Sequence, residues 1–137
     1  MKSKKIISFL LIACVLFTIP ITAYAGCTWS DKRTISVNED SGWKRTTTKK
    51  DFAVDLKETE SNLYYVTTVA LSMYNNPQFR LVNSNNQVRG EAIKTGNKGN
   101  TKHGTNNGAK GHKYFAAIKP NSWQTGTDNY TFTFSAE

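Results

Sequence analysis

Tyr130-Thr131-Phe132-Thr133-Phe134, close to the end of the 137-residue chain, alternates aromatic and threonine side chains at every position. Successive side chains of an extended chain point to opposite faces, so the aromatic rings share one face and the threonines share the other. This period of two is typical of a half-buried β-strand. The segment therefore predicts a closing strand whose aromatic face lies in the core.

Leu63–Tyr74 is the longest segment of the same kind. One face carries Leu63, Tyr65, Val69, Leu71 and Met73, and the other carries Tyr64, Val66, Ala70 and Tyr74. A strand that is apolar on both faces is expected in the middle of a sheet. We therefore predict a central strand here.

The segment Asp51–Glu58 alternates over a shorter distance. Its apolar face consists of Phe52, Val54 and Leu56, and Asp55 and Lys57 lie on the opposite face. The pattern predicts a half-buried strand with the apolar side chains in the core and the charged ones in solvent.

Other short segments are rich in β-branched and aromatic residues, and turn-forming residues separate them. They are Thr34–Val37, Trp43–Thr48, Phe79–Val82, Gln87–Lys94 and Tyr114–Lys119. No segment has the period of a helix. About eight short strands predict one all-β domain, an antiparallel β-sandwich rather than a small barrel, because strands apolar on one and on both faces suit two stacked sheets.

Residues 1–25 have the pattern of an export signal. Lysines precede the apolar run 6–22, and Ala23 and Ala25 supply the small residues of a cleavage site. The run is shorter than the roughly 20 residues of a membrane-spanning helix. We therefore predict a signal peptide cleaved after Ala25, a secreted domain at 26–137, and no transmembrane segment after cleavage.

Cys27 leaves a second interpretation of this boundary open. Ala25-Gly26-Cys27 fits the end of a bacterial lipoprotein box, although Tyr24 stands where leucine is usual. In that case the protein would be anchored through a lipid on Cys27. Cys27 is the only cysteine after the predicted cleavage site, so no intramolecular disulfide is expected.

Residues 95–113 combine glycine, asparagine and threonine with lysine, and they contain both histidines and no acid. Because glycines are frequent and large apolar side chains are absent, the segment predicts a long loop instead of a helix or a buried strand. The formal net charge of the chain is +8, and much of the excess lies in this loop and its flanks. Such an excess favours anionic partners.

The loop contains two Gly-x-Lys-Gly sequences, Gly96–Gly99 and Gly108–Gly111. Glycine lets backbone N–H groups approach an anion while the lysine supplies charge. The predicted anion-binding residues are Lys94, Lys98, Lys102, His103, Lys110, His112 and Lys113. The alternative is a solvated insertion whose lysines contact only water.

Trp43 and Trp123 stand in polar surroundings. A tryptophan in such a place can provide an aromatic contact to a ligand, because its ring is apolar and its N–H is a hydrogen-bond donor. The alternative is that each ring covers one end of the core.

A small secreted nuclease is the enzyme class that best suits the size and charge of the chain. It would use His103 or His112 as acid and base, Lys102 or Lys113 to stabilise phosphate charge, and Glu91 as a partner. The sequence lacks a rigid pairing of nucleophile and base, so we predict no catalytic residues. Two histidines without a nearby acid or cysteine fall short of a zinc site, and no metal or other cofactor is predicted.

The layout of export signal, lysine- and asparagine-rich β domain and aromatic–threonine closing strand resembles small exported proteins of Gram-positive bacteria, mainly over Tyr114–Phe134. These include the lactococcin-972-like bacteriocins, and the resemblance implies a secreted β-sandwich that acts on the cell envelope. The His-rich strand region of that family is absent here, so its activity is not carried over.

The leading prediction is a non-catalytic domain at the bacterial cell envelope. Its expected partner is an anionic cell-wall polymer, a polysaccharide or a membrane surface, and nucleic acid is not expected. A bacteriocin-like antimicrobial protein and a small nuclease are the alternatives. The identity of the partner and the oligomeric state stay open.

Overall fold

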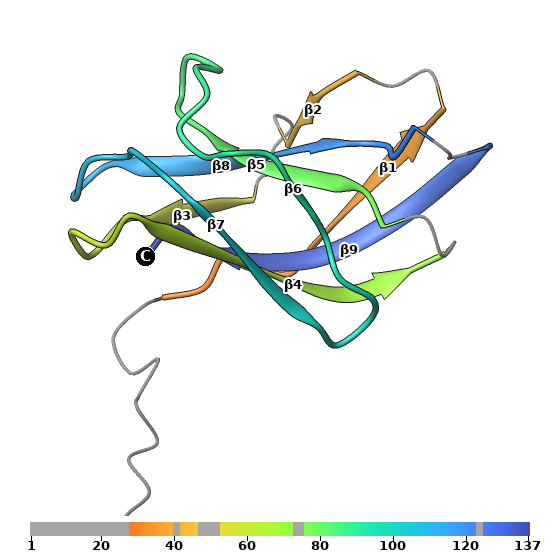
Figure 1. The fold of residues 1–137 in the computed structure, drawn as a ribbon, viewed down its shortest axis with the longest axis horizontal. Helices are drawn as coiled ribbons and strands as arrows, with labels where there is room; N and C mark the ends of the chain where they lie inside the picture. Colours follow the sequence, from red (N-terminus) through yellow and green to blue (C-terminus); the bar gives the residue numbers. More distant parts are fainter. Residues whose placement is uncertain (1–27, 40–41, 47–52, 73–75, 123–124) are drawn as a thin grey trace, which may run out of the picture.

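The structure is a computed structural model that describes residues 28–39, 42–46, 53–72, 76–122 and 125–137. The predicted signal peptide, Cys27, Phe52 and Trp123 lie outside the described residues. Within the described residues the chain is all-β, with nine strands in two antiparallel sheets and no helix (Figure 1). The all-β prediction is confirmed.

The first sheet has four strands, with β9 and β4 in its middle. Across the sheet the order is β1 (Arg33–Asn38), β9 (Thr127–Ser135), β4 (Leu63–Leu71) and β7 (Thr101–Thr105). The two longest strands, β4 and β9, pair along most of their length (Figure 1). The prediction that 63–74 contains a central strand is therefore confirmed.

The second sheet has five strands arranged around β8 (Lys113–Lys119). One edge of β8 pairs with β5 (Gln78–Val82), which also pairs with β6 (Ile93–Lys94). The other edge of β8 pairs with both β2 (Lys44–Arg45) and β3 (Val54–Leu56). Because β2 and β3 follow each other along the same edge, they act as one interrupted strand.

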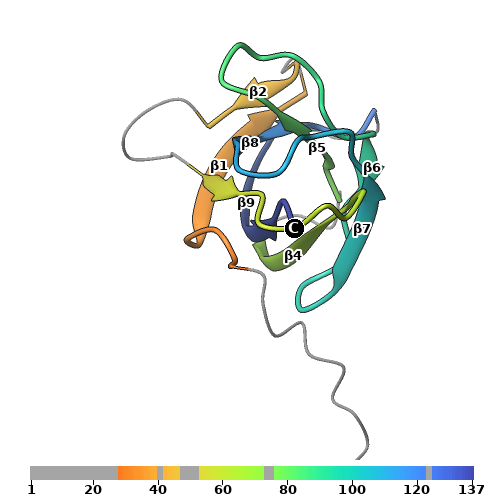
Figure 2. The same ribbon diagram turned by 90° about the vertical axis from the view of Figure 1, so that its left-hand side faces the viewer.

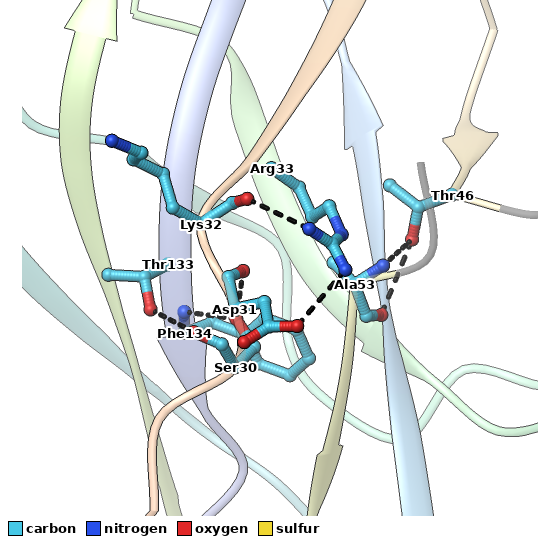
Figure 3. Close-up of polar contacts among 8 residues, drawn as sticks. All are labelled: Ser30, Asp31, Lys32, Arg33, Thr46, Ala53, Thr133 and Phe134. Atoms are coloured by element: carbon cyan, nitrogen blue, oxygen red, sulfur yellow. Dashed lines mark hydrogen bonds and ion pairs between the residues drawn. The ribbon is translucent and has the colours of Figure 1, made fainter. Parts of the chain in front are cut away.

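Thr46 holds the two halves of this interrupted strand together. Its hydroxyl accepts a hydrogen bond from the Ala53 N–H at 3.1 Å and donates one to the Ala53 carbonyl at 3.3 Å (Figure 3). Thr46 is 1% exposed, so these bonds also satisfy its hydroxyl in a buried position. These bonds therefore keep β2 and β3 in register with β8.

Among the described residues, backbone hydrogen bonds join the two sheets on one side, where β6 and β7 lie next to each other (Figure 2). There Gly90 and Asn106 form an antiparallel bridge, and the Glu91 N–H donates to the Thr105 carbonyl at 3.0 Å. On the opposite side, no pairing joins β1 to β2 or β3 among the described residues. We call this second side the open seam.

The core between the sheets is mostly aromatic. Tyr64, Phe79, Tyr130, Phe132 and Phe134 are fully buried. The Tyr130 and Phe132 rings stack with centroids 5.1 Å apart, and Phe79 of the other sheet meets Phe132 edge-on at 5.7 Å. The aromatic face predicted for 130–134 is thus confirmed.

A β-bulge in β4 changes which side chains face the core. Tyr64, Val66 and Thr68 are buried, and the register with β9 shifts between Thr68 and Ala70. An extra residue reverses the alternation beyond it, so Leu71 packs against the core as well. The bulge therefore explains why Leu71 packs against the core although it has the same parity as Tyr65, which faces outward.

The prediction for the faces of 51–58 is wrong. Asp55 and Lys57 are 5% and 1% exposed, whereas Leu56 is 40% exposed. The charged side chains are inside because the end of the chain satisfies them. The Asp55 Oδ2 accepts from the Ala136 N–H at 2.7 Å, and the Lys57 Nζ donates to the Glu137 backbone oxygen at 2.9 Å.

The prediction of a continuous loop over 95–113 is also wrong, because β7 lies in its middle as an edge strand paired with β4. Gly104 explains how a glycine-rich segment can do this. A Cβ at Gly104 would lie 2.6 Å from the Tyr64 Cε1, so only glycine lets β7 approach the buried Tyr64 ring. The other side chains of β7 are exposed and need no apolar character.

Candidate anion-binding face

The two Gly-x-Lys-Gly sequences form separate turns at opposite ends of β7. Gly99 and Gly111 adopt φ angles of +84° and +81°, a conformation that favours glycine. The five residues of β7 between the turns span roughly 17 Å of extended chain. The turns therefore cannot enclose one small anion together.

Most of the predicted anion-binding residues do not come together. His103 faces Tyr65 on the outer surface of the four-stranded sheet, with ring centroids 6.0 Å apart. The Lys102 side chain lies over Gly96 at the sheet edge. Lys98 lies before β7, and Lys110 and His112 lie between β7 and β8.

Lys94 and Lys113 lie instead on the outer face of the five-stranded sheet. Tyr114, Ala116 and Ile118 of β8 belong to the core, so the alternating residues of β8 point outward. Register places Gln78 opposite both Lys119 and Lys94, and Ala117 opposite both Arg45 and Arg80. We call this surface the basic face; it comprises Trp43, Arg45, Gln78, Arg80, Lys94, Lys113, Phe115, Ala117 and Lys119.

Two arginines on the basic face stack on aromatic rings. The Arg45 Cζ lies 4.0 Å from the centroid of the Phe115 ring, and the Arg80 Cζ lies 4.0 Å from that of Trp43. Ala117 between them is 3% exposed, so neighbouring side chains cover it. A guanidinium held on a ring loses less conformational freedom when it binds a ligand.

The two arginines differ in their hydrogen bonds. Arg45 Nη1 donates to the Ser84 carbonyl at 2.7 Å and to the Asn86 Oδ1 at 2.9 Å. Arg80 makes neither a hydrogen bond nor an ion pair with the described residues, and its Nε is buried without a partner. Burial lowers the pKa of Arg80 from its usual value. Arg80 is therefore a half-buried cation without a counter-ion in the described structure.

The outward positions of β2, β3, β5, β6 and β8 include no acid. The cations among them are Arg45, Arg80, Lys94, Lys113 and Lys119. Like charges gathered on one surface raise its positive potential and attract anions. The sequence prediction included Lys94, Lys113 and Trp43 but missed both arginines and Lys119. The alternation of 114–119 could have placed Lys119 on the same face as Lys113.

The residues considered for a nuclease are engaged separately. His103 lies against Tyr65, whereas the His112 carbonyl accepts from the Lys57 N–H at 3.0 Å. The Glu91 Oε1 accepts from the Thr105 N–H at 3.1 Å. The described part of the chain contains no group of three or more metal-ligating side chains that could hold an ion.

None of the residues described forms a helix long and apolar enough to cross a membrane. Comparisons with protein-family models, with curated proteins and with solved structures each find no match. The chemistry of the basic face is therefore the basis for assigning a function.

Proposed function

We propose that this chain is a non-catalytic, exported β-sandwich domain that binds an anionic polymer at the bacterial cell envelope through the basic face. The observation that carries the proposal is Arg80, a half-buried guanidinium held on Trp43 without a counter-ion among the described residues. A phosphate or carboxylate of the ligand would supply that counter-ion, because the planar guanidinium can bind two oxygens at once.

The arrangement of charges suits a polymer better than a single small anion. Arg45 and Arg80 flank Ala117, and Lys119 and Lys94 flank Gln78 in the next outward row. Neighbouring strands are about 4.8 Å apart, so the cations repeat across the sheet. A chain of repeated anionic groups could contact several of them together.

The test compares Arg80→Gln with Lys98→Gln in binding to long-chain polyphosphate at about 0.05 M salt, measured by calorimetry. We expect Arg80→Gln to lower the affinity about tenfold, because a charge-assisted hydrogen bond contributes roughly 1.5–3 kcal/mol. Lys98→Gln should lower it less than about twofold, because an exposed lysine in a turn contributes little.

Two results would overturn the proposal. The first is a larger loss from the combined variant Lys98→Gln, Lys102→Gln and Lys110→Gln than from Arg80→Gln, which would return the site to the segment 95–113. The second is binding that persists unchanged at about 0.5 M salt, where screening acts within a few ångströms. Polygalacturonate in place of polyphosphate distinguishes carboxylate from phosphate polymers.

Export itself is part of the proposal. The mass of the protein recovered from the culture medium tests it, because cleavage after Ala25 leaves an unmodified chain that begins at Gly26. A diacylated Cys27 in the membrane fraction would support the lipoprotein alternative instead.

A further inference from the structure

A pocket of about 460 Å³ opens at the open seam. One wall is the segment 28–33 that leads into β1, and the other is β3 together with Lys113 of β8. Its volume lies in the range of small-ligand sites, roughly 300–1,000 Å³. We call it the seam pocket.

The wall formed by 28–33 is held firmly against β9 (Figure 3). The Ser30 N–H donates to the Phe134 carbonyl at 2.7 Å, and the Phe134 N–H donates to the Ser30 Oγ at 3.0 Å. Thr133 Oγ1 donates to the Ser30 carbonyl at 2.7 Å. The pocket wall is therefore preformed and needs little ordering when a ligand binds.

The Thr28 hydroxyl lies between the carboxylate of Asp55, which lines the seam pocket, and that of Glu58. Its hydroxyl lies 3.3 Å from the Asp55 Oδ1 and 3.2 Å from the Glu58 Oε2. A hydroxyl has one proton and can donate it to only one of them at a time. The Thr28 N–H donates to the Glu58 Oε2 at 2.9 Å, and the Leu56 N–H donates to the Asp55 carboxylate, so the shared Thr28 hydroxyl is the weakest of the donors to Asp55.

The negative charge of Asp55 and Glu58 also favours a cation at this place. Burial raises the pKa of Asp55 to about 6, and the nearby Glu58 contributes in the same direction. Asp55 therefore carries its charge at pH 7 at an energetic cost. A ligand with an ammonium group would stabilise that charge and could donate to the Asp55 Oδ1 in place of the Thr28 hydroxyl.

The other charged groups of the pocket favour an anion beside that ammonium. Arg33 pairs with Asp31 at 3.1 Å, so these two largely neutralise each other. Lys113 is exposed and also belongs to the basic face. The half-buried Trp29 supplies an apolar wall.

We propose that the seam pocket binds a zwitterionic group, a primary ammonium placed at Asp55 together with a phosphate placed at Lys113. The group is of the phosphoethanolamine type, in which two carbons separate the charges. The proposal deepens the proposed function, because Lys113 is common to the pocket and the basic face. It implies that the anionic polymer or headgroup carries primary amines.

The test is a titration of the full chain with O-phosphoethanolamine at pH 7, followed by the amide NMR signals of Thr28, Asp55 and Leu56. These signals should shift with saturation. Ethyl phosphate lacks the amine and ethanolamine lacks the phosphate, so each should bind at least tenfold more weakly. Phosphocholine cannot donate an N–H to Asp55 and should also bind more weakly. Equal binding of phosphocholine or of ethyl phosphate would overturn the proposal.

Asp55→Asn should lower the affinity for O-phosphoethanolamine at least fivefold and leave polyphosphate binding unchanged, whereas Arg80→Gln should do the reverse. The two variants therefore show separately whether the proposal for the seam pocket or the proposal for the basic face is wrong. Thr28→Val removes the competing hydroxyl from an exposed position and should bind O-phosphoethanolamine at least as tightly as the unchanged protein. A loss of binding in Thr28→Val would contradict the assignment of the ammonium to Asp55.

Two sources could supply this group, and vesicles distinguish them. Vesicles of equal parts phosphatidylethanolamine and phosphatidylcholine are compared with pure phosphatidylcholine. Selective binding to the mixed vesicles assigns the group to a lipid headgroup. Binding of the free compound alone assigns it to an amine-bearing phosphate polymer. Binding of neither would overturn the proposal.

Discussion

The outer faces of the two sheets are both exposed to solvent, but their polar side chains are arranged differently. On the four-stranded sheet, hydroxyls pair across strands: Thr34 with Thr131 at 2.8 Å and Thr67 with Thr101 at 2.7 Å. On the five-stranded sheet, arginines lie on aromatic rings, and Arg80 has no counter-ion among the described residues. The first face satisfies its own polar groups, whereas the second leaves positive charge for a ligand to neutralise.

The largest expected effect concerns the open seam between these sheets. The folded pKa of Asp55 is about 6, above its ordinary 3.8, with burial as the main cause. The protonated Asp55 carboxyl therefore contributes fully to the unfolding free energy below pH 3.8, and this contribution is lost as the pH rises to about 6. When the pH is raised from about 4 to about 7.5, the unfolding free energy of the unchanged protein should fall. This fall should exceed that of Asp55→Asn by up to about 3 kcal/mol.

Urea unfolding of both proteins at several pH values measures this difference. Asparagine keeps an oxygen that can accept from the Ala136 N–H, so the variant retains the contact that orients residue 55. Parallel stability curves for the two proteins would show that Asp55 does not titrate near pH 6.

A smaller effect is expected from exchanging one ring on each face for leucine. Trp43→Leu removes the ring under Arg80 and should lower polyphosphate affinity about threefold, because a cation–π contact contributes roughly 0.5–1 kcal/mol at an exposed site. Tyr65→Leu removes the ring beside His103 on the other face and serves as the matched control. An equal loss of affinity in both variants would remove the distinction between the faces.

The smallest effect is expected from Thr67→Val. It removes one cross-strand hydroxyl pair, and Thr101 is exposed and can bond to water instead. Its unfolding free energy should fall by no more than about 0.5 kcal/mol, and polyphosphate binding should not change. Calorimetric melting and the same binding assay check both statements. A measurable loss of polyphosphate binding would place the ligand on the four-stranded sheet.

Much of the fold was predictable wherever alternation is strong and local. The strands β4, β8 and β9 were expected from their own residues, because a buried aromatic or aliphatic face leaves a period of two in the sequence. The bulge in β4 left a trace too, because the core residues before it, Tyr64 and Val66, have even numbers and the core residue beyond it, Leu71, has an odd one. The strand β7 was missed altogether because an exposed edge strand needs no apolar pattern.

The faces of β3 could not be predicted from local pattern. Alternation shows that two faces differ, but contacts from elsewhere decide which one is buried. Asp55 and Lys57 turn inward because backbone groups of Ala136 and Glu137, about eighty residues away in the sequence, satisfy their polar atoms. Such long-range compensation leaves no local signal.

The candidate site shows the same limit. Lys94 and Lys113 were predicted from a basic segment, but Arg45, Arg80 and Lys119 come from β2, β5 and the far end of β8, and strand order and register place them on the same face. The seam pocket was not foreseen at all, because its walls join residues near 30 with residues near 55 and 113.

By itself, the sequence determined the all-β class, the aromatic core face of 130–134 and the excess of positive charge. These depend on composition and on the two-residue period, which a strand carries locally. Only the tertiary structure decided where that charge is concentrated, which face of β3 is buried and on which side backbone hydrogen bonds join the sheets. Those features depend on which strands become neighbours, and burial and hydrogen bonding between distant segments decide that.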